Sequence, residues 1–126
     1  MMRPLHTTGY PRVETTPDDV RVVMPSEIDL SNAPSIGQEI LLLLNAGADP
    51  VILDLTGTRF CDSQGVSVIV RAIVRARGLH ARLVLVVPEG SGPHRVLDIY
   101  GLNRFLPTAP SLAEARLLIA DMPQPS

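Results

Sequence analysis

The sequence contains no lysine, and all 11 of its basic residues are arginine. A phosphate-binding-loop lysine, a Schiff-base lysine and a lysine general base are therefore excluded. Asp and Glu number 13, so the net charge is −2 and the basic surplus of a nucleic-acid-binding or membrane-surface protein is missing. We expect neither nucleic acid nor a membrane among the partners of this chain.

Cysteine is nearly absent. Cys61 is the single thiol, which excludes an internal disulfide and a cysteine-based zinc cluster. No stretch approaches the roughly 18 apolar residues of a membrane span, and Met1–Pro17 lacks the apolar core of a signal peptide. We expect a cytoplasmic protein without metal or cofactor, and a Cys61 that is a small buried residue rather than a redox group.

The chain nevertheless has enough apolar material for one domain, with 126 residues of which 45% are hydrophobic and 19% charged. Its 12 prolines avoid the stretch Val51–Val87, which should hold the centre of the fold because proline breaks helix interiors and central strands. We expect a partly extended N-terminal segment over residues 1–19, with an edge strand near Arg12–Thr15. A folded domain over residues 20–120 and a flexible tail over residues 121–126 should follow.

Strand and helix patterns alternate along the expected domain. The expected strands are Val20–Met24, Val51–Leu55, Leu83–Val87 and a short one at Phe105–Pro107. The first expected helix begins near Ser31 or Asn32 and ends at Gly47. The second stops at Gly78, and Ser63 lies in its first turn or just before it. The third covers about Pro93–Tyr100, and the fourth runs from the capping residue Ser111 to about Ala120. This order predicts an α/β fold with a mixed, mostly parallel sheet of four to five strands and about four helices, packed largely on one side.

Two of these helices have a clear apolar face. In the first it comprises Ile36, Ile40, Leu43 and Leu44, and in the second Val66, Ile69, Val70, Ile73 and Val74. Leu41 and Leu42 widen the first face, and we expect them to add core contacts rather than to form a weak homodimer. The Arg71–Arg75 side of the second helix is either solvated or meets an acidic partner surface. Asp54 must reach the loop end of its strand or be hydrogen-bonded.

The loop Thr56–Gly65 is the candidate site, because ligands and partners of parallel sheets gather where strands lead into helices. Asp62 or Ser63 can cap the following helix. The free N–H groups at that helix start would also tolerate a phosphate on Ser63, which would add about −1.5 to −2 charges beside Asp62. Capping and a phosphorylation switch are compatible, and Gly65 would allow another backbone to approach closely.

A nucleophile elbow is the competing interpretation of Ser63. Hydrolases place the serine in Gly-x-Ser-x-Gly at a strand-to-helix turn, but Cys61 stands at the position of the first glycine. The candidate bases are His6, His80 and His94, of which only His94 lies at a helix start. We therefore favour a protein that is not an enzyme.

Three segments in order resemble the STAS domain, the fold of anti-sigma factor antagonists and of the cytoplasmic tails of sulphate transporters. They are Ser26–Leu30 with Asn32-Ala33-Pro34, Val51–Leu55 leading through Phe60 into Asp62-Ser63-Gln64-Gly65, and Val96–Leu102. The family counterparts are Gly-Glu-Leu-Asp with Thr-Ala-Pro, a strand with Asp-Ser-Ser-Gly or Asp-Ser-Thr-Gly, and a helix ending in a Gly-Leu turn. The resemblance covers about Val20–Ala120 and implies a STAS fold.

The resemblance also implies a function. Such antagonists bind an anti-sigma factor that is a serine kinase using its own ATP, and so free a sigma factor. The kinase phosphorylates the serine here numbered Ser63, the complex separates, and a serine phosphatase restores it. By this resemblance Asp29, Asp62, Ser63, Gln64 and Gly65 would form the partner-binding site.

The sequence departs from the family pattern at two positions. Ser26 replaces a glycine in the first segment, and Gln64 replaces a small Ser or Thr beside the phosphoacceptor. The longer Gln64 side chain should alter the fit of a kinase or select among partners. The alternative function is a STAS interaction subunit of another assembly, such as a stress-sensing complex or a lipid-transport machine, without a sigma-factor role.

Overall fold

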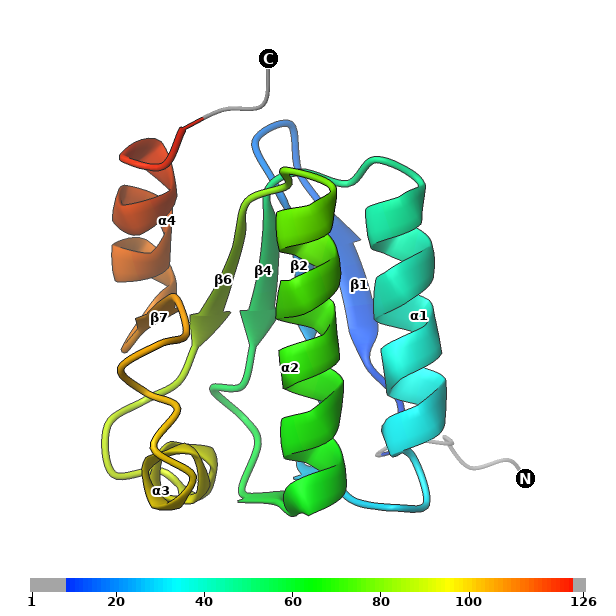
Figure 1. Ribbon diagram of the computed structural model, residues 1–126, viewed down its shortest axis with the longest axis vertical. Helices are drawn as coiled ribbons and strands as arrows, with labels where there is room; N and C mark the ends of the chain where they lie inside the picture. Colours follow the sequence, from blue (N-terminus) through cyan, green and yellow to red (C-terminus); the bar gives the residue numbers. More distant parts are fainter. Residues whose placement is uncertain (1–8, 124–126) are drawn as a thin grey trace, which may run out of the picture.

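The computed structural model describes residues 9–123, and a five-stranded sheet lies at its centre (Figure 1). The sheet has the strand order β1-β2-β4-β6-β7, with β1 antiparallel to β2 and all other neighbours parallel. Its strands are β1 (Arg12–Thr15), β2 (Val20–Val23), β4 (Val51–Asp54), β6 (Leu83–Val86) and β7 (Thr108–Ala109). The predicted mixed, mostly parallel sheet is confirmed, including the edge strand at Arg12–Thr15.

Four helices accompany the sheet, as predicted. They are α1 (Ala33–Asn45), α2 (Ser63–Gly78), α3 (Gly92–Ile99) and α4 (Leu112–Ala120). In Figure 1, α1 and α2 lie side by side in front of the sheet, whereas α3 lies across its lower end and is seen down its axis. None of these helices is long and apolar enough to cross a membrane.

Two apolar clusters show that the helices occupy both faces of the sheet. The larger contains α1, α2 and one set of strand residues, among them Val22, Leu53 and Leu85. The smaller contains the alternate strand residues Ile52 and Val84, with Ala115 and Ile119 of α4. The expectation of helices largely on one side is therefore corrected, because the alternate apolar residues of these buried strands need a cover of their own.

The buried face of α2 differs from the predicted one. Val66, Ile69 and Ile73 are buried, and Val70 is half-buried. Val74 is 63% exposed, contrary to the prediction, whereas Val68 and Ala72 are buried because they face α1. In α1, Ile36, Ile40 and Leu44 are buried as predicted and Leu43 is half-buried. The expected core contact of Leu42 is wrong, since its side chain is 63% exposed.

Helices α1 and α2 are each followed by a residue in the left-handed conformation. Gly47 ends α1 as predicted, with a φ of 97° and an N–H that donates to the Leu44 carbonyl at 3.0 Å. Gly78 is still helical, and the left-handed residue after α2 is His80, with a φ of 58°. The predicted end of α2 at Gly78 is therefore confirmed, although His80 rather than this glycine takes the left-handed conformation.

Short strands account for the remaining differences. The final strand is Thr108–Ala109 rather than Phe105–Pro107. A second sheet, absent from the prediction, pairs β3 (Glu27–Ile28) with β5 (Phe60–Cys61) in parallel. Two-residue strands have no periodicity to detect, so they are found only once their partners are known.

The two terminal segments are only partly described. Residues 1–8 of the expected N-terminal segment, including His6, and residues 124–126 of the expected tail lie outside the described residues. The hairpin of β1 and β2 spans the expected boundary at Val20. At the other end, Met122 packs against the smaller apolar cluster.

Asp54 is a buried carboxylate at the end of β4, with 3% of its surface exposed. It accepts hydrogen bonds from the Thr56 hydroxyl and backbone N–H, and it forms an ion pair with the Arg21 guanidinium at 2.9 Å. Burial raises the pKa of the Asp54 carboxyl, but these bonds outweigh it and lower the pKa below the ordinary 3.8. Both possibilities that the sequence left open are therefore confirmed, because Asp54 is the last residue of β4 and its carboxylate is hydrogen-bonded.

Replacing Asp54 with asparagine should destabilise the domain at pH 7 by about 1–3 kcal/mol, because charge-assisted hydrogen bonds are lost. A carboxyl whose folded-state pKa is lowered contributes stability above its unfolded pKa and loses that contribution as the pH falls through the folded value. Urea unfolding at several pH values should therefore show the difference shrinking below pH 4. Glu89→Gln is the control at an exposed carboxylate and should change little at any pH, and an equal loss there would contradict the prediction.

Candidate functional site

The candidate site lies at the end of the sheet where α1, α2 and α3 all begin (Figure 1). The small sheet of β3 and β5 joins the two loops that carry it, with Ile28 paired to Cys61. Asp29 and Asp62 directly follow this pair, and the Asp62 N–H donates to the Ile28 carbonyl at 3.1 Å. Two motifs far apart in the sequence are thereby placed next to each other.

Asp62 is the N-cap of α2. Its Oδ1 accepts hydrogen bonds from the backbone N–H of Gln64 at 2.8 Å and of Gly65 at 3.3 Å. Ser63 is the first residue of the helix and is exposed, and its hydroxyl makes no hydrogen bond within the described chain. The capping interpretation is confirmed for Asp62, and the arrangement leaves the Ser63 hydroxyl accessible to a reagent or enzyme.

The Asp29 loop is fixed by its own side chains. The Asp29 carboxylate accepts hydrogen bonds from the Ser31 hydroxyl and N–H, and these bonds lower the pKa of the Asp29 carboxyl. Asn32 accepts a bond from the Asp29 N–H at 2.9 Å and donates to the Glu27 carbonyl at 2.7 Å. In the part of the chain that the structure describes, neither Asp29 nor Asp62 takes part in an ion pair.

Gly65 allows the first turn of α2 to contact the small sheet. A Cβ at this position would lie 2.4 Å from the Cys61 Sγ and 3.0 Å from a methyl group of Ile28. A close approach is therefore present as predicted, but it is made by the side chains of Cys61 and Ile28 rather than by a backbone. Gln64 and Ser63 lie on the other, exposed side of the same turn.

Cys61 is a buried free thiol within this contact. Burial, and to a smaller extent the charge of Asp62, raise the pKa of the Cys61 thiol to about 11. The thiol is therefore protonated at neutral pH and is a weak nucleophile. This agrees with the expectation of a small buried residue and gives no support to a redox role.

The described histidines do not form a catalytic pair with Ser63. His80 lies beyond the far end of α2, and His94 accepts a bond from the Gly90 N–H at 3.3 Å. Neither histidine is hydrogen-bonded to Ser63, and His6 is outside the described residues. Within residues 9–123, no group of three or more His, Cys, Asp or Glu side chains could hold a metal ion.

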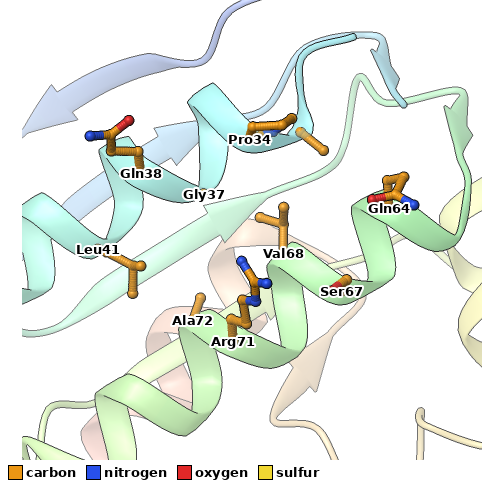
Figure 2. A pocket seen from close by; sticks show the side chains of 10 residues that line it. Pro34, Gly37, Gln38, Leu41, Gln64, Ser67, Val68, Arg71 and Ala72 are labelled. Carbon is orange, nitrogen blue, oxygen red and sulfur yellow. The ribbon is translucent and has the colours of Figure 1, made fainter. Parts of the chain in front are cut away.

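A groove of about 330 Å³ runs from the candidate site between α1 and α2 (Figure 2). Gln64 and Ser67 line its end near the site, and Arg71 lines it one turn further along α2. Pro34, Gln38 and Leu41 line it from α1. The sequence patterns point to Gln64, Arg71 and Leu41 separately. They cannot place these residues together, because the side-by-side packing of α1 and α2 is not a local property of either helix.

Comparison with known proteins identifies the family. A sequence model of the STAS domain matches residues 10–115, which is most of the chain. The chain belongs to the STAS domain family. Its sheet order and four helices are the fold that the three sequence segments implied.

Solved structures show the same fold. An anti-sigma factor antagonist from Mycobacterium paratuberculosis has a TM-score of 0.80 at 23% identity, over 88% of this chain and 93% of that one. An anti-sigma-factor antagonist (STAS) domain protein from Planctomyces limnophilus has a TM-score of 0.72 at 21% identity, over 86% and 96%. The Bacillus cell fate determinant SpoIIAA in its phosphorylated form has a TM-score of 0.64 at 22% identity, over 84% and 96%.

Proposed function

We propose that this protein is an anti-sigma factor antagonist. It binds an anti-sigma factor that is a serine kinase, and by doing so it releases a sigma factor. Phosphorylation of Ser63 by the ATP-bearing kinase ends the binding, and a serine phosphatase reverses the modification. On this proposal the protein is not an enzyme, and its site consists of Asp29, Asp62, Ser63, Gln64 and Gly65.

The observation that carries the proposal is the accessible Ser63 hydroxyl in a rigid frame. Two contacts fix the first turn of α2. Asp62 caps the helix, and Gly65 packs against Ile28 and Cys61. The hydroxyl projects from the exposed side of that turn. A kinase can therefore reach it without unfolding the helix, and a docked partner would cover it.

Charge explains how one phosphate could end the binding. Phosphorylation would add about −1.5 to −2 charges to Ser63, whose sequence neighbour is Asp62 and whose spatial neighbour is the Asp29 loop. Neither carboxylate forms an ion pair within the described residues, although the exposed Arg59 lines a hollow together with Asp29. A partner already placed against two carboxylates would meet a more negative surface.

The proposal is tested by binding the unmodified protein, Ser63→Ala and Ser63→Asp to purified candidate anti-sigma factor kinases from the source organism. We expect Ser63→Asp to weaken binding at least about tenfold, because like charges brought together at an interface cost several kcal/mol. Ser63→Ala should still bind. Thr15→Asp, which places the same charge on an exposed position of the edge strand β1, is the matched control and should bind like the unmodified protein.

A parallel incubation with ATP, followed by intact-mass and peptide mass measurement, tests the modification itself. One phosphate on Ser63, absent from Ser63→Ala, is the expected result. Equal binding of all variants with no phosphate would remove the switch from the proposal. If no kinase binds, the sigma-factor role is wrong, and the chain is better explained as a STAS interaction subunit of another assembly.

A further inference from the structure

The surface formed by α1 and α2 combines a groove with exposed apolar side chains. Leu42 and Val74 are each 63% exposed on these helices. The groove floor is apolar where Gly37 of α1 lies against Val68 of α2, since a Cβ on Gly37 would be 3.4 Å from a Val68 methyl group. Leu41 adds a partly buried apolar wall. Such a surface suits the apolar side of an inserted peptide segment.

The charge of this surface is opposite to that of the chain. The whole protein has a net charge of −2, but α2 contains three arginines and no acidic residue, and α1 contains Glu39 as its single charged residue. Arg75 is held by the Asn45 side chain at 2.8 Å, and Arg77 approaches the Phe105 carbonyl at 3.4 Å. The two helices together carry a net positive charge, so the carboxylates of a partner would be attracted to this surface.

Arg71 is the arginine of this set that lines the groove. It is exposed and forms no ion pair or hydrogen bond with any described residue, and no acidic side chain lines the groove with it. Figure 2 shows the Arg71 side chain rising from α2 into the space between the two helices, across from Leu41. An incoming carboxylate could form an ion pair here without displacing one that already exists.

We propose that the α1–α2 groove is a docking site for an acidic, amphipathic segment of a partner protein. The apolar side of that segment packs on Pro34, Leu41 and Val68, which line the groove, and its carboxylates pair with Arg71. If the proposed function holds, the anti-sigma factor kinase carries this segment. The inference then names the chemistry of the contact that Ser63 phosphorylation breaks.

The position of Ser63 links the groove to the switch. Gln64, the next residue in the sequence, lines the groove at the end where α2 begins. A phosphate on Ser63 would therefore place its charge at the mouth of a groove that holds carboxylates. The phosphate would repel an acidic segment there. Arg71, about two helical turns away, would still attract the carboxylates of that segment.

The first test uses a synthetic amphipathic peptide with leucines along one side and glutamates flanking them, titrated into the isotope-labelled full chain and followed by NMR. We expect shifts of the backbone signals of Gln38, Leu41, Ser67 and Arg71. Arg71→Glu should weaken binding at least about tenfold, whereas Arg104→Glu, with the same charge change on an exposed loop outside the groove, should not. A peptide with lysines in place of the glutamates should not bind.

Several results would overturn the inference. They are shifts confined to other surfaces, equal binding of the two peptides, or no effect of Arg71→Glu in a variant whose unfolding temperature is unchanged. Sedimentation equilibrium measures whether a second copy of this chain occupies the groove instead. A dimer that Arg71→Glu dissociates would mean that a second copy of this chain fills the groove, and the acidic-segment proposal would be wrong.

A second test separates this inference from the proposed function. If a kinase binds both Ser63→Asp and Arg71→Glu at least about tenfold more weakly than the unmodified protein, the result supports the antagonist function and the groove proposal. If a kinase binds Ser63→Asp more weakly but binds Arg71→Glu normally, the antagonist function is supported. The proposal that the groove is the docking site of the kinase is then wrong. If the acidic peptide binds in the groove but no kinase does, the docking chemistry stands and the sigma-factor role fails.

Discussion

Replacing Ile69 with aspartate should abolish the cooperative unfolding transition of this domain. Ile69 has 0% of its surface exposed and lies in the middle of α2, within the larger apolar cluster. Removing such a side chain alone costs about 2–5 kcal/mol, and burying an unpaired carboxylate adds several more. The sum is comparable to the entire stability of a small domain, about 5–15 kcal/mol.

The matched control is Val74→Asp, five residues further along the same helix. Val74 is 63% exposed, so the same substitution should change the free energy of unfolding by less than about 1 kcal/mol. Circular dichroism during thermal and urea unfolding would measure both variants. Ile69→Ala, expected to lose about 2–5 kcal/mol, keeps the comparison quantitative if Ile69→Asp cannot be purified. A folded Ile69→Asp with a normal transition would contradict the assigned orientation of α2.

This pair of residues shows how far the sequence determines the helix faces. The period of the apolar residues in α2 is strong enough to predict Val66, Ile69 and Ile73 as buried. It cannot predict that a second helix covers Val68 and Ala72 from the side, because nothing local to α2 specifies the position of α1. The buried arc is consequently shifted toward α1, and Val74 moves into solvent.

The strands follow the same division between local and distant information. β2, β4 and β6 are apolar runs bounded by turn residues, and each was predicted to within a residue. β3, β5 and β7 contain two residues each, and their existence depends on a partner strand elsewhere in the chain. Residue type alone limits the cap of α2 to Asp62 or Ser63, and the structure shows that it is Asp62. The placement of Asp29 beside it could not, since it depends on the pairing of Ile28 with Cys61.

Substituting alanine for Gly92 should be the most damaging change of a single methyl group at the candidate site. A Cβ on Gly92 would lie 2.2 Å from the Arg59 carbonyl oxygen and 3.1 Å from its carbon. Backbone atoms cannot rotate away as a flexible side chain can, so α3 and the strand β5 must separate. We expect a loss of about 2–3 kcal/mol in the free energy of unfolding, the upper part of the range for overpacking.

Gly57→Ala is the control for this substitution. Gly57 lies in the loop that carries Arg59, has a φ outside the left-handed region and has no atom within 4 Å of the added Cβ. Its stability should stay within about 0.5 kcal/mol of the unmodified protein. Gly92→Ala should also weaken binding of a kinase partner at a temperature where the variant is fully folded. The displaced segment, Arg59 and Phe60, leads directly into Asp62 and Ser63, so a shift of β5 moves the cap of α2. Normal stability together with normal binding would show that α3 does not support the site.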